Sequence, residues 1–184
     1  MAHISLPEGL PGIVGPMHQY PETEVPLNAL AQALLRGPSS LTPAERELIA
    51  TYVSSQNDCW FCMSTHRSAT QHLLKSEGQS PAIVDLVRQN VETAPVSEKM
   101  RALLVIAGKV QQGGRRVTEA DVAKAREEGA DDKAIHDTVL IAATFCMFNR
   151  YVDGLATWAP EDESAFEASG ARLATQGYTN SIPR

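Results

Sequence analysis

The chain has 184 residues, 43% of them apolar, which suits a single compact domain whose core is large enough to fold without disulfide bridges. Its formal net charge of −6 gives no basic patch for nucleic acid or an anionic membrane surface, so we expect neither partner. The first ten residues lack the basic region and apolar run of a signal peptide, and no apolar stretch is long enough to span a bilayer. We therefore expect a soluble cytoplasmic protein whose three cysteines are reduced.

Prolines crowd the start of the chain. Pro7, Pro11, Pro16 and Pro21 interrupt the first 25 residues, and this spacing disfavours a continuous helix or a central strand. We expect residues 1–25 to form an extended N-terminal arm that lies either on its own subunit or on a neighbouring one.

Capping signals recur over residues 26–159, and no segment alternates apolar and polar residues as a strand would. The spacings of Thr42 with Glu45 and of Thr118 with Asp121 are those of capping boxes. Helices are predicted from Pro26 to Arg36, from Pro43 to about Ser54, from a cap at Asn57 or Asp58 to Lys75, from Ser80 to about Asn90, from Ser97 to Val110, from Thr118 to Gly129, and from Asp131 into a long apolar stretch. The pattern predicts an all-α, single-domain helical bundle, followed by a polar tail over residues 160–184.

Two cysteines lie close together in QNDCWFCMSTH, residues 56–66. On a helix, Cys59, Cys62 and His66 would share one face, because they are three and seven residues apart. The positive end of a helix dipole favours a thiolate, and two cysteines at this spacing can close into a disulfide. The pattern therefore favours redox chemistry, with two packed thiols beside a surface histidine as the plain alternative.

Zinc is a third possibility for such a cysteine pair. A tetrahedral zinc site needs four protein ligands, or three with an open position. Beyond the motif only Cys146 remains as a thiol, and His72 would point away from His66 because it lies one and a half turns further along the helix. We therefore expect no metal, and no organic cofactor.

A glutamate, Glu47, lies twelve residues before the CxxCxxxH run. This spacing resembles the AhpD-like alkylhydroperoxidase core of the carboxymuconolactone decarboxylase superfamily. The downstream run FCMFNRYVDGLAT, residues 145–157, is similar to the end of the peroxidase-related branch of that family. Together the resemblance covers roughly residues 27–158 and leaves both terminal segments outside it.

The resemblance implies an all-helical protein that assembles into a homo-oligomer, whether dimer, trimer or hexamer. It also implies that Cys62 attacks a hydroperoxide, that Cys59 resolves the sulfenic acid, and that a dithiol reductant restores the pair. Glu47 and His66 would form the proton relay. One residue departs from the pattern, because the best-known members carry a histidine directly before the later cysteine and this chain has Phe61 there.

Two other functions stay open from the sequence. A cofactor-free enzyme resembling the lactone decarboxylases of the same family would use Glu47 and His66 as acid and base without thiol turnover. A redox-sensing or zinc-stabilised interaction module would use the cysteines without catalysis.

The remaining candidates are expected to be structural. Cys146 lies in the most apolar helix and should be inert, and Arg150 and Asp153 have the spacing of an ion pair within that helix. Asn149 could reach the thiols, but its spacing in the sequence gives no evidence for that contact. The following aromatic residues should pack in the core or at a subunit interface: Trp60, Phe61, Phe145, Phe148 and Tyr151.

Overall fold

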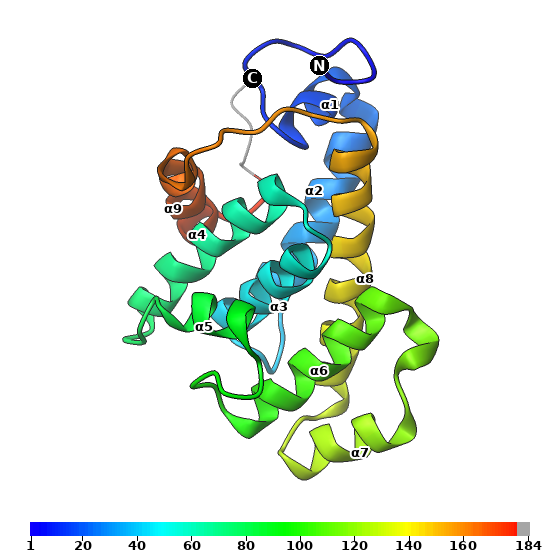
Figure 1. The fold of residues 1–184 in the computed structure, drawn as a ribbon, viewed down its shortest axis with the longest axis vertical. Coiled ribbons are helices and arrows are strands. Elements are labelled where there is room, and N and C mark those ends of the chain that lie inside the picture. Colours follow the sequence, from blue (N-terminus) through cyan, green and yellow to red (C-terminus); the bar gives the residue numbers. More distant parts are fainter. Residues whose placement is uncertain (180–184) are drawn as a thin grey trace.

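The computed structural model describes residues 1–179, so residues 180–184 of the expected tail lie outside it. Over the described range the chain forms nine α-helices and two short 3₁₀ helices and contains no strand, which confirms the all-α prediction (Figure 1). The elements are α1 (Val14–Gln19), α2 (Pro21–Arg36), α3 (Pro43–Gln56), α4 (Trp60–Ser76), α5 (Ile83–Gln89), α6 (Glu98–Gln112), η1 (Gly114–Arg116), α7 (Glu119–Glu127), α8 (Asp132–Gly154), η2 (Glu163–Phe166) and α9 (Glu167–Gln176).

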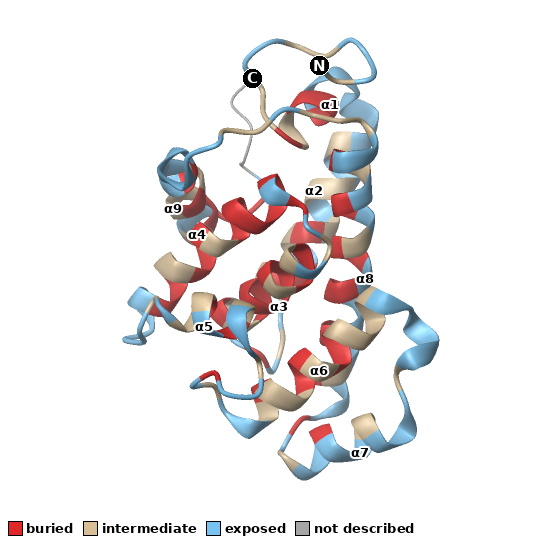
Figure 2. Cartoon of the chain, viewed as in Figure 1, coloured by how far each residue is buried: buried red, intermediate tan, exposed pale blue. Residues whose placement is uncertain are grey.

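Helix α3 is the centre of the bundle. It packs against α4, α6 and α8, while α4 carries α9 along its other side and α7 packs on α6. Figure 2 shows that buried residues gather on α3, α4 and the inward side of α8, whereas α7 is mostly exposed. None of the helices within residues 1–179 combines the length and apolar character needed to cross a membrane.

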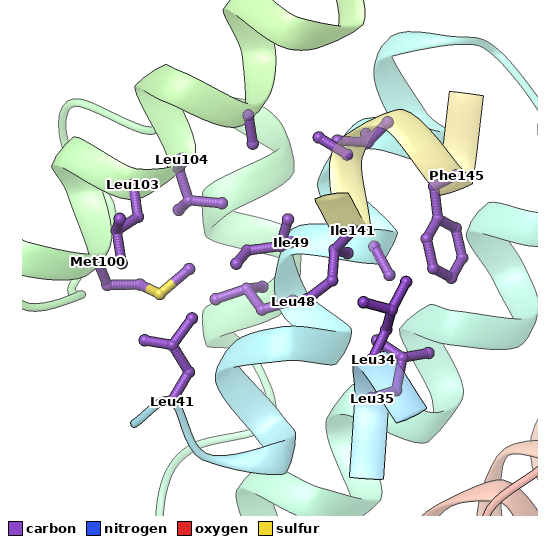
Figure 3. Close-up of a cluster of buried hydrophobic side chains, with 14 of the residues drawn as sticks. Leu34, Leu35, Leu41, Leu48, Ile49, Met100, Leu103, Leu104, Ile141 and Phe145 are labelled. Carbon is purple, nitrogen blue, oxygen red and sulfur yellow. The ribbon is translucent and has the colours of Figure 1, made fainter. Parts of the chain in front are cut away.

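The main core lies between α2, α3, α6 and α8 (Figure 3). Its side chains are branched aliphatic and aromatic groups, all but excluded from solvent: Leu34, Leu35, Leu48, Ile49, Leu103, Leu104, Ile141 and Phe145. Burying side chains of this size contributes roughly 1.5–3 kcal/mol each, so these contacts fix how α3 sits against its neighbours. Helix α3 in turn carries Glu47 and Thr51 with no exposure to solvent.

Four predicted helix starts are confirmed by their caps. Thr42 and Thr118 both make the reciprocal capping box with the residue three positions on. Ser97 accepts a hydrogen bond from the Met100 N–H, and Asp131 accepts one from the Ala134 N–H. These contacts satisfy backbone donors that a helix start leaves without partners, and the signal is local in sequence.

The N-terminal segment differs from the extended arm predicted for residues 1–25, because α1 and the first part of α2 fall within it. Pro16 lies in the first turn of α1 and Pro21 is the first residue of α2. Proline is tolerated there because first-turn N–H groups have no partner within the helix. Residues ahead of α1 are held against the end of α8, where the His3 N–H bonds to the Leu155 carbonyl at 2.9 Å.

The C-terminal segment is also more structured than the tail predicted from residue 160. It forms η2 and then α9, which packs along α4. Phe166, Gly170 and Leu173 are buried at helical spacing, and this short repeat indicates a helix where the polar composition indicates a tail. A Cβ atom on Gly170 would lie 2.2 Å from Ser68 Oγ, so only glycine allows α9 to approach α4 this closely.

Candidate active site

The cysteine motif begins helix α4. Helix α3 ends at Gln56 with Asn57 as its C-cap. Asp58 then takes a left-handed backbone conformation with φ of 55°, so the chain turns sharply and Cys59 becomes the N-cap of α4. The predicted cap at Asn57 or Asp58 is therefore wrong. The reason is tertiary, because the Asn57 side chain donates to Asn149 Oδ1 at 2.8 Å, and the Cys59 N–H bonds to the Ser54 carbonyl at 3.1 Å.

The two cysteines of the motif have different surroundings, although both are free thiols and both are buried. Cys59 has no exposed surface, whereas Cys62, at 4% exposure, lines a cavity. A hydrogen bond with Cys62, together with burial, raises the pKa of the Cys59 thiol and keeps it protonated. Cys62 is thus the cysteine that a small molecule can reach, and Cys59 stands behind it.

Asp153 approaches Cys59 from the last turn of α8. Burial raises the pKa of this carboxyl group, and a hydrogen bond from the Cys59 thiol opposes that rise. The predicted ion pair between Arg150 and Asp153 is absent from the described residues, and Arg150 Nη1 instead donates to the Cys146 carbonyl at 2.9 Å. Asn149, the other candidate on this helix, donates to Ser54 Oγ at 3.1 Å and does not line the cavity.

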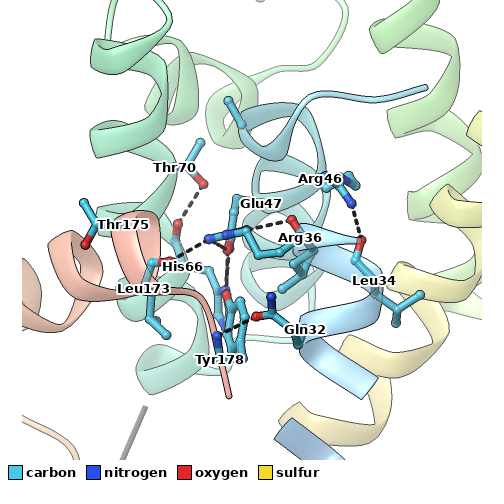
Figure 4. A network of polar contacts seen from close by, with 12 residues as sticks. Gln32, Leu34, Arg36, Arg46, Glu47, His66, Thr70, Leu173, Thr175 and Tyr178 are labelled. Atoms are coloured by element: carbon cyan, nitrogen blue, oxygen red, sulfur yellow. Dashed lines mark hydrogen bonds and ion pairs between the residues drawn. The ribbon is translucent and has the colours of Figure 1, made fainter. Parts of the chain in front are cut away.

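Glu47 and His66, the two predicted relay residues, do meet in the structure (Figure 4). His66 Nδ1 lies 2.7 Å from Glu47 Oε2, in the contact between α3 and α4. An ionised carboxylate can only accept, so Nδ1 carries the proton and Nε2 is the imidazole nitrogen left to act as a base. His66 lines the same cavity as Cys62.

Two further side chains hold the other oxygen of Glu47. Arg36 Nη2 donates to Oε1 at 2.7 Å, and Tyr178 Oη donates to the same atom at 2.6 Å (Figure 4). Tyr178 Oη is also 3.3 Å from His66 Nδ1, and the Arg36 guanidinium lies 5.3 Å from the centre of the tyrosine ring. Glu47 therefore takes part in three polar contacts without any exposed surface.

These contacts decide the charge of the cluster. Burial by itself would raise the pKa of Glu47, but His66, Arg36 and the Tyr178 hydroxyl together lower it to about 2. Burial and the neighbouring Glu47 carboxylate raise the pKa of Tyr178 well above its usual value. At neutral pH the carboxylate is therefore ionised and the phenol is a hydrogen-bond donor.

Sequence reasoning did not find Arg36 or Tyr178, since they lie 11 and 131 residues from Glu47. Arg36 ends α2, and its Nη2 also donates to the Leu173 carbonyl at 3.0 Å. Tyr178 is brought in by a turn at Gly177, where φ is 69°, and its N–H donates to Gln32 Oε1 at 2.8 Å. No local pattern in the sequence predicts such long-range contacts.

The cavity above Cys62 has a volume of about 210 Å³ and is mostly apolar. Its polar wall includes Cys62, Thr65, His66 and Tyr178. The apolar wall comes from the N-terminal segment, from α4 and α8, and from the C-terminal segment, through Ile13, Val14, Met17, Phe61, Phe145, Phe148, Phe166 and Leu173. Both terminal segments thus complete a site whose reactive groups lie in the central helices.

Phe61 contributes to this wall rather than to a proton path. Its ring packs 5.9 Å from that of Phe166, and the chain at Gly12 lies so close that a Cβ atom there would be 2.1 Å from Phe61 Cδ1. Gly12 also has a φ of 55° and donates its N–H to the Trp158 carbonyl at 2.9 Å. Trp60 points outward and donates to the Pro160 carbonyl at 2.7 Å.

The aromatic prediction is confirmed for the core, and packing at a subunit interface stays a prediction for the two more exposed residues. Phe145 and Phe148 are buried as expected, while Tyr151 is half-buried and Trp60 is 37% exposed. Within residues 1–179 no group of three or more His, Cys, Asp and Glu side chains converges as a metal site would require. Cys146 is half-buried and receives a hydrogen bond from Asn57 at 3.5 Å.

The fold and the site define an all-α protein with a buried dithiol at the start of one helix and a Glu–His pair beside it. Residues 21–107 match the model of the Carboxymuconolactone decarboxylase family, the same family that the sequence resemblance indicated. No match was found among curated proteins.

Solved structures extend the likeness beyond the family match. An uncharacterized peroxidase-related protein from Ralstonia eutropha JMP134, described as an alkylhydroperoxidase AhpD core, is 29% identical with a TM-score of 0.75, over 88% of this chain and 81% of its own. An uncharacterized peroxidase-related protein from Silicibacter sp. TM1040 is 28% identical with a TM-score of 0.68, over 79% and 72%. A protein of unknown function from Agrobacterium tumefaciens, 20% identical with a TM-score of 0.66 over 82% and 99%, shares the fold.

Proposed function

We propose that this protein is a thiol-dependent peroxidase that reduces an organic hydroperoxide through a dithiol–disulfide cycle of Cys62 and Cys59. The observation that carries the proposal is the inequality of the two thiols: Cys62 opens into an apolar cavity beside His66, and Cys59 is enclosed behind it and stays protonated. The descriptions of two solved relatives as peroxidase-related, one of them as an AhpD core, support the same function.

In the first step His66 acts as the base. Its Nε2 takes the proton of the Cys62 thiol, and the thiolate attacks the terminal oxygen of the hydroperoxide. The S–O bond forms as the O–O bond breaks, and the leaving alkoxide takes the proton from the imidazolium and departs as an alcohol. Glu47, ionised and fixed by Arg36 and Tyr178, orients the ring and stabilises the imidazolium.

In the second step Cys59 attacks the sulfur of the Cys62 sulfenic acid. The S–S bond forms while the S–O bond breaks, and the hydroxide released takes the Cys59 proton and leaves as water. Asp153, hydrogen-bonded to the Cys59 thiol, is placed to pass on that proton. A dithiol reductant then exchanges with the disulfide, becoming oxidised itself, and restores both thiols.

Decarboxylation of a lactone by Glu47 and His66 is the rival function, since the matching family is named for a decarboxylase. It would require Glu47 to exchange a proton near neutral pH. With a pKa of about 2 and three hydrogen-bonding partners, Glu47 is poorly suited to that role and well suited to a permanently charged one. The arrangement therefore favours the peroxidase.

Substitution of each cysteine tests the proposal. Cys62→Ser should abolish consumption of an organic hydroperoxide such as cumene hydroperoxide, whereas Cys59→Ser should undergo one rapid oxidation at Cys62 and then stop. A sulfenic-acid reagent followed by mass spectrometry should label Cys62 in the Cys59→Ser protein. Cys146→Ser is the matched control and should retain full turnover. Labelling of Cys59 in the Cys62→Ser protein would refute the assignment. Turnover by a variant in which both motif cysteines are replaced would refute it as well.

A further inference from the structure

Thr65 lies between the proposed nucleophile and the proposed base in the sequence of α4. It follows Cys62 by three residues and precedes His66, and all three line the cavity. Residues three apart on a helix share a face, so Thr65 stands over the same part of the cavity as the thiol. The side chain is nine-tenths buried, with 8% exposure.

The Thr65 hydroxyl lacks the hydrogen bond that two other buried threonines near the Glu47–His66 pair make. Its Oγ1 is shielded from solvent and finds no hydrogen-bond partner within residues 1–179. Thr70, further along the same helix, donates to the His66 carbonyl at 2.7 Å, and Thr51 on α3 donates to the Glu47 carbonyl at 2.9 Å. A buried hydroxyl without a partner costs free energy, so a lone one beside the reactive groups requires an explanation.

Building on the proposed peroxidase function, we propose that Thr65 is a catalytic residue whose Oγ1–H donates a hydrogen bond to the hydroperoxide bound at Cys62. In a helix threonine has two accessible χ1 rotamers, so the hydroxyl can turn toward a ligand in the cavity. The bond grows stronger as the O–O bond breaks, because negative charge then builds on the leaving oxygen. Bound substrate supplies the acceptor that the protein lacks.

In this role Thr65 does not deprotonate the Cys62 thiol, which is the role of His66. A hydroxyl that binds the peroxide changes the reaction of Cys62 with a peroxide and leaves its reaction with an alkylating agent unaltered, because iodoacetamide has no peroxide bond. A hydroxyl that merely packed the helix would change neither reaction, and one that activated the thiol would change both. Two reagents acting on one sulfur atom therefore separate these roles.

The test uses the isosteric variant Thr65→Val in the full chain, with Thr65→Ser as the conservative variant. Thr138→Val is the matched control, because Thr138 Oγ1 on α8 is also buried without a partner in the described chain but does not line the cavity. Stopped-flow kinetics would measure oxidation of Cys62 by cumene hydroperoxide, and mass spectrometry its alkylation by iodoacetamide across pH. Circular dichroism would verify that each variant is folded.

We expect Thr65→Val to oxidise at least about tenfold more slowly than wild type, with an unchanged alkylation profile, and both Thr65→Ser and Thr138→Val to react as wild type does. Wild-type oxidation in Thr65→Val, or an equal loss in alkylation, would overturn the inference while the proposed function stands. A wild-type protein whose Cys62 does not react with the hydroperoxide at all would overturn both.

Discussion

Glu47 shows how one buried carboxylate can organise a site. Removing one partner from a buried ion pair leaves the other charge uncompensated, which commonly costs 3–5 kcal/mol. Glu47→Gln would do this to Arg36, whose side chain is largely buried in contact with the carboxylate. Experiments on the relay must therefore separate its chemistry from the stability of the cluster, and the double variant Arg36→Met/Glu47→Gln removes both charges together.

The relay itself predicts a pH effect at Cys62. We expect His66→Ala and Glu47→Gln each to move the pH profile of Cys62 alkylation to higher pH, lowering the rate at pH 7 on the order of tenfold. The variant lacking both groups should be little worse than His66→Ala, because the carboxylate acts through the imidazole.

Iodoacetamide alkylation followed across pH measures the shift of the Cys62 profile. Asp85→Asn is a suitable control, since Asp85 also forms an ion pair, with Arg67, but does not line the cavity. Profiles that stay in place in both single variants would mean that the helix start alone activates Cys62. Additive losses would mean that Glu47 acts independently of His66.

The pKa of Glu47 predicts a second effect, on stability. Its pKa is about 2 in the folded protein against an ordinary 4.5, so between these values the unfolded chain binds a proton that the folded chain does not. The contribution is present above about pH 4.5 and is lost as pH falls toward 2, by about 3 kcal/mol in total.

Denaturant unfolding at a series of pH values measures it. The stability of the double variant Arg36→Met/Glu47→Gln should fall less steeply with acid than that of wild type. Parallel curves for the two proteins would show that Glu47 titrates alike in the folded and unfolded states.

Among the helices, the contact between α4 and α9 determines the position of one wall of the cavity. Helix α9 carries Leu173, and the segment after it carries Tyr178, so the position of α9 determines where both side chains lie. Gly170 permits the close approach, since a Cβ atom there would lie 2.2 Å from Ser68 Oγ and 2.8 Å from the backbone nitrogen of Ala69.

Gly170→Ala should therefore destabilise the protein by about 1–3 kcal/mol, because backbone atoms of α4 cannot yield as a flexible side chain can. Thermal unfolding measures the change. Gly114→Ala is the control, since nothing lies within 4 Å of a Cβ atom at that position. Equal melting temperatures for Gly170→Ala and wild type would contradict the packing argument.

At the scale of the whole molecule, self-association stays a prediction. The family resemblance implied an oligomer, and a position on a neighbouring subunit was open for the N-terminal arm, yet both terminal segments fold against the same chain and line its cavity. Another feature now supports it. The long helix α8 exposes Val139, Leu140 and Met147, at 36%, 37% and 44%, along its outer side.

Light scattering at micromolar concentration should give a multiple of the 19.9 kDa chain mass. A monomer mass would refute this prediction. Deleting residues 1–25 should also impair the fold, because it removes Met17 and the apolar lining at Ile13 and Val14. A truncated protein as stable as the full chain would show that this segment is dispensable.

Local signals in the sequence determined the all-α class and most helix starts. Thr42, Ser97, Thr118 and Asp131 each form their cap with a residue three positions away, so the information lies within one turn of helix. The shared face of Cys62 and His66 follows from helical geometry in the same way, whereas Cys59 lies just outside the helix as its N-cap. The predictions for the two terminal segments are wrong. Proline spacing and polar composition indicate an arm and a tail, but proline is tolerated in the first turn of a helix, and a short apolar repeat at helical spacing indicates a buried helix face.

Tertiary structure alone decided the electrostatics of the site and the roles open to its thiols. Arg36 and Tyr178 reach Glu47 from distant parts of the chain, and these contacts, with His66, hold the carboxylate ionised. The opening of Cys62 to a cavity, and the enclosure of Cys59, depend on where α8 and both terminal segments pack. Local sequence patterns do not predict the burial or the charge of these groups, because both depend on side chains that only folding brings near.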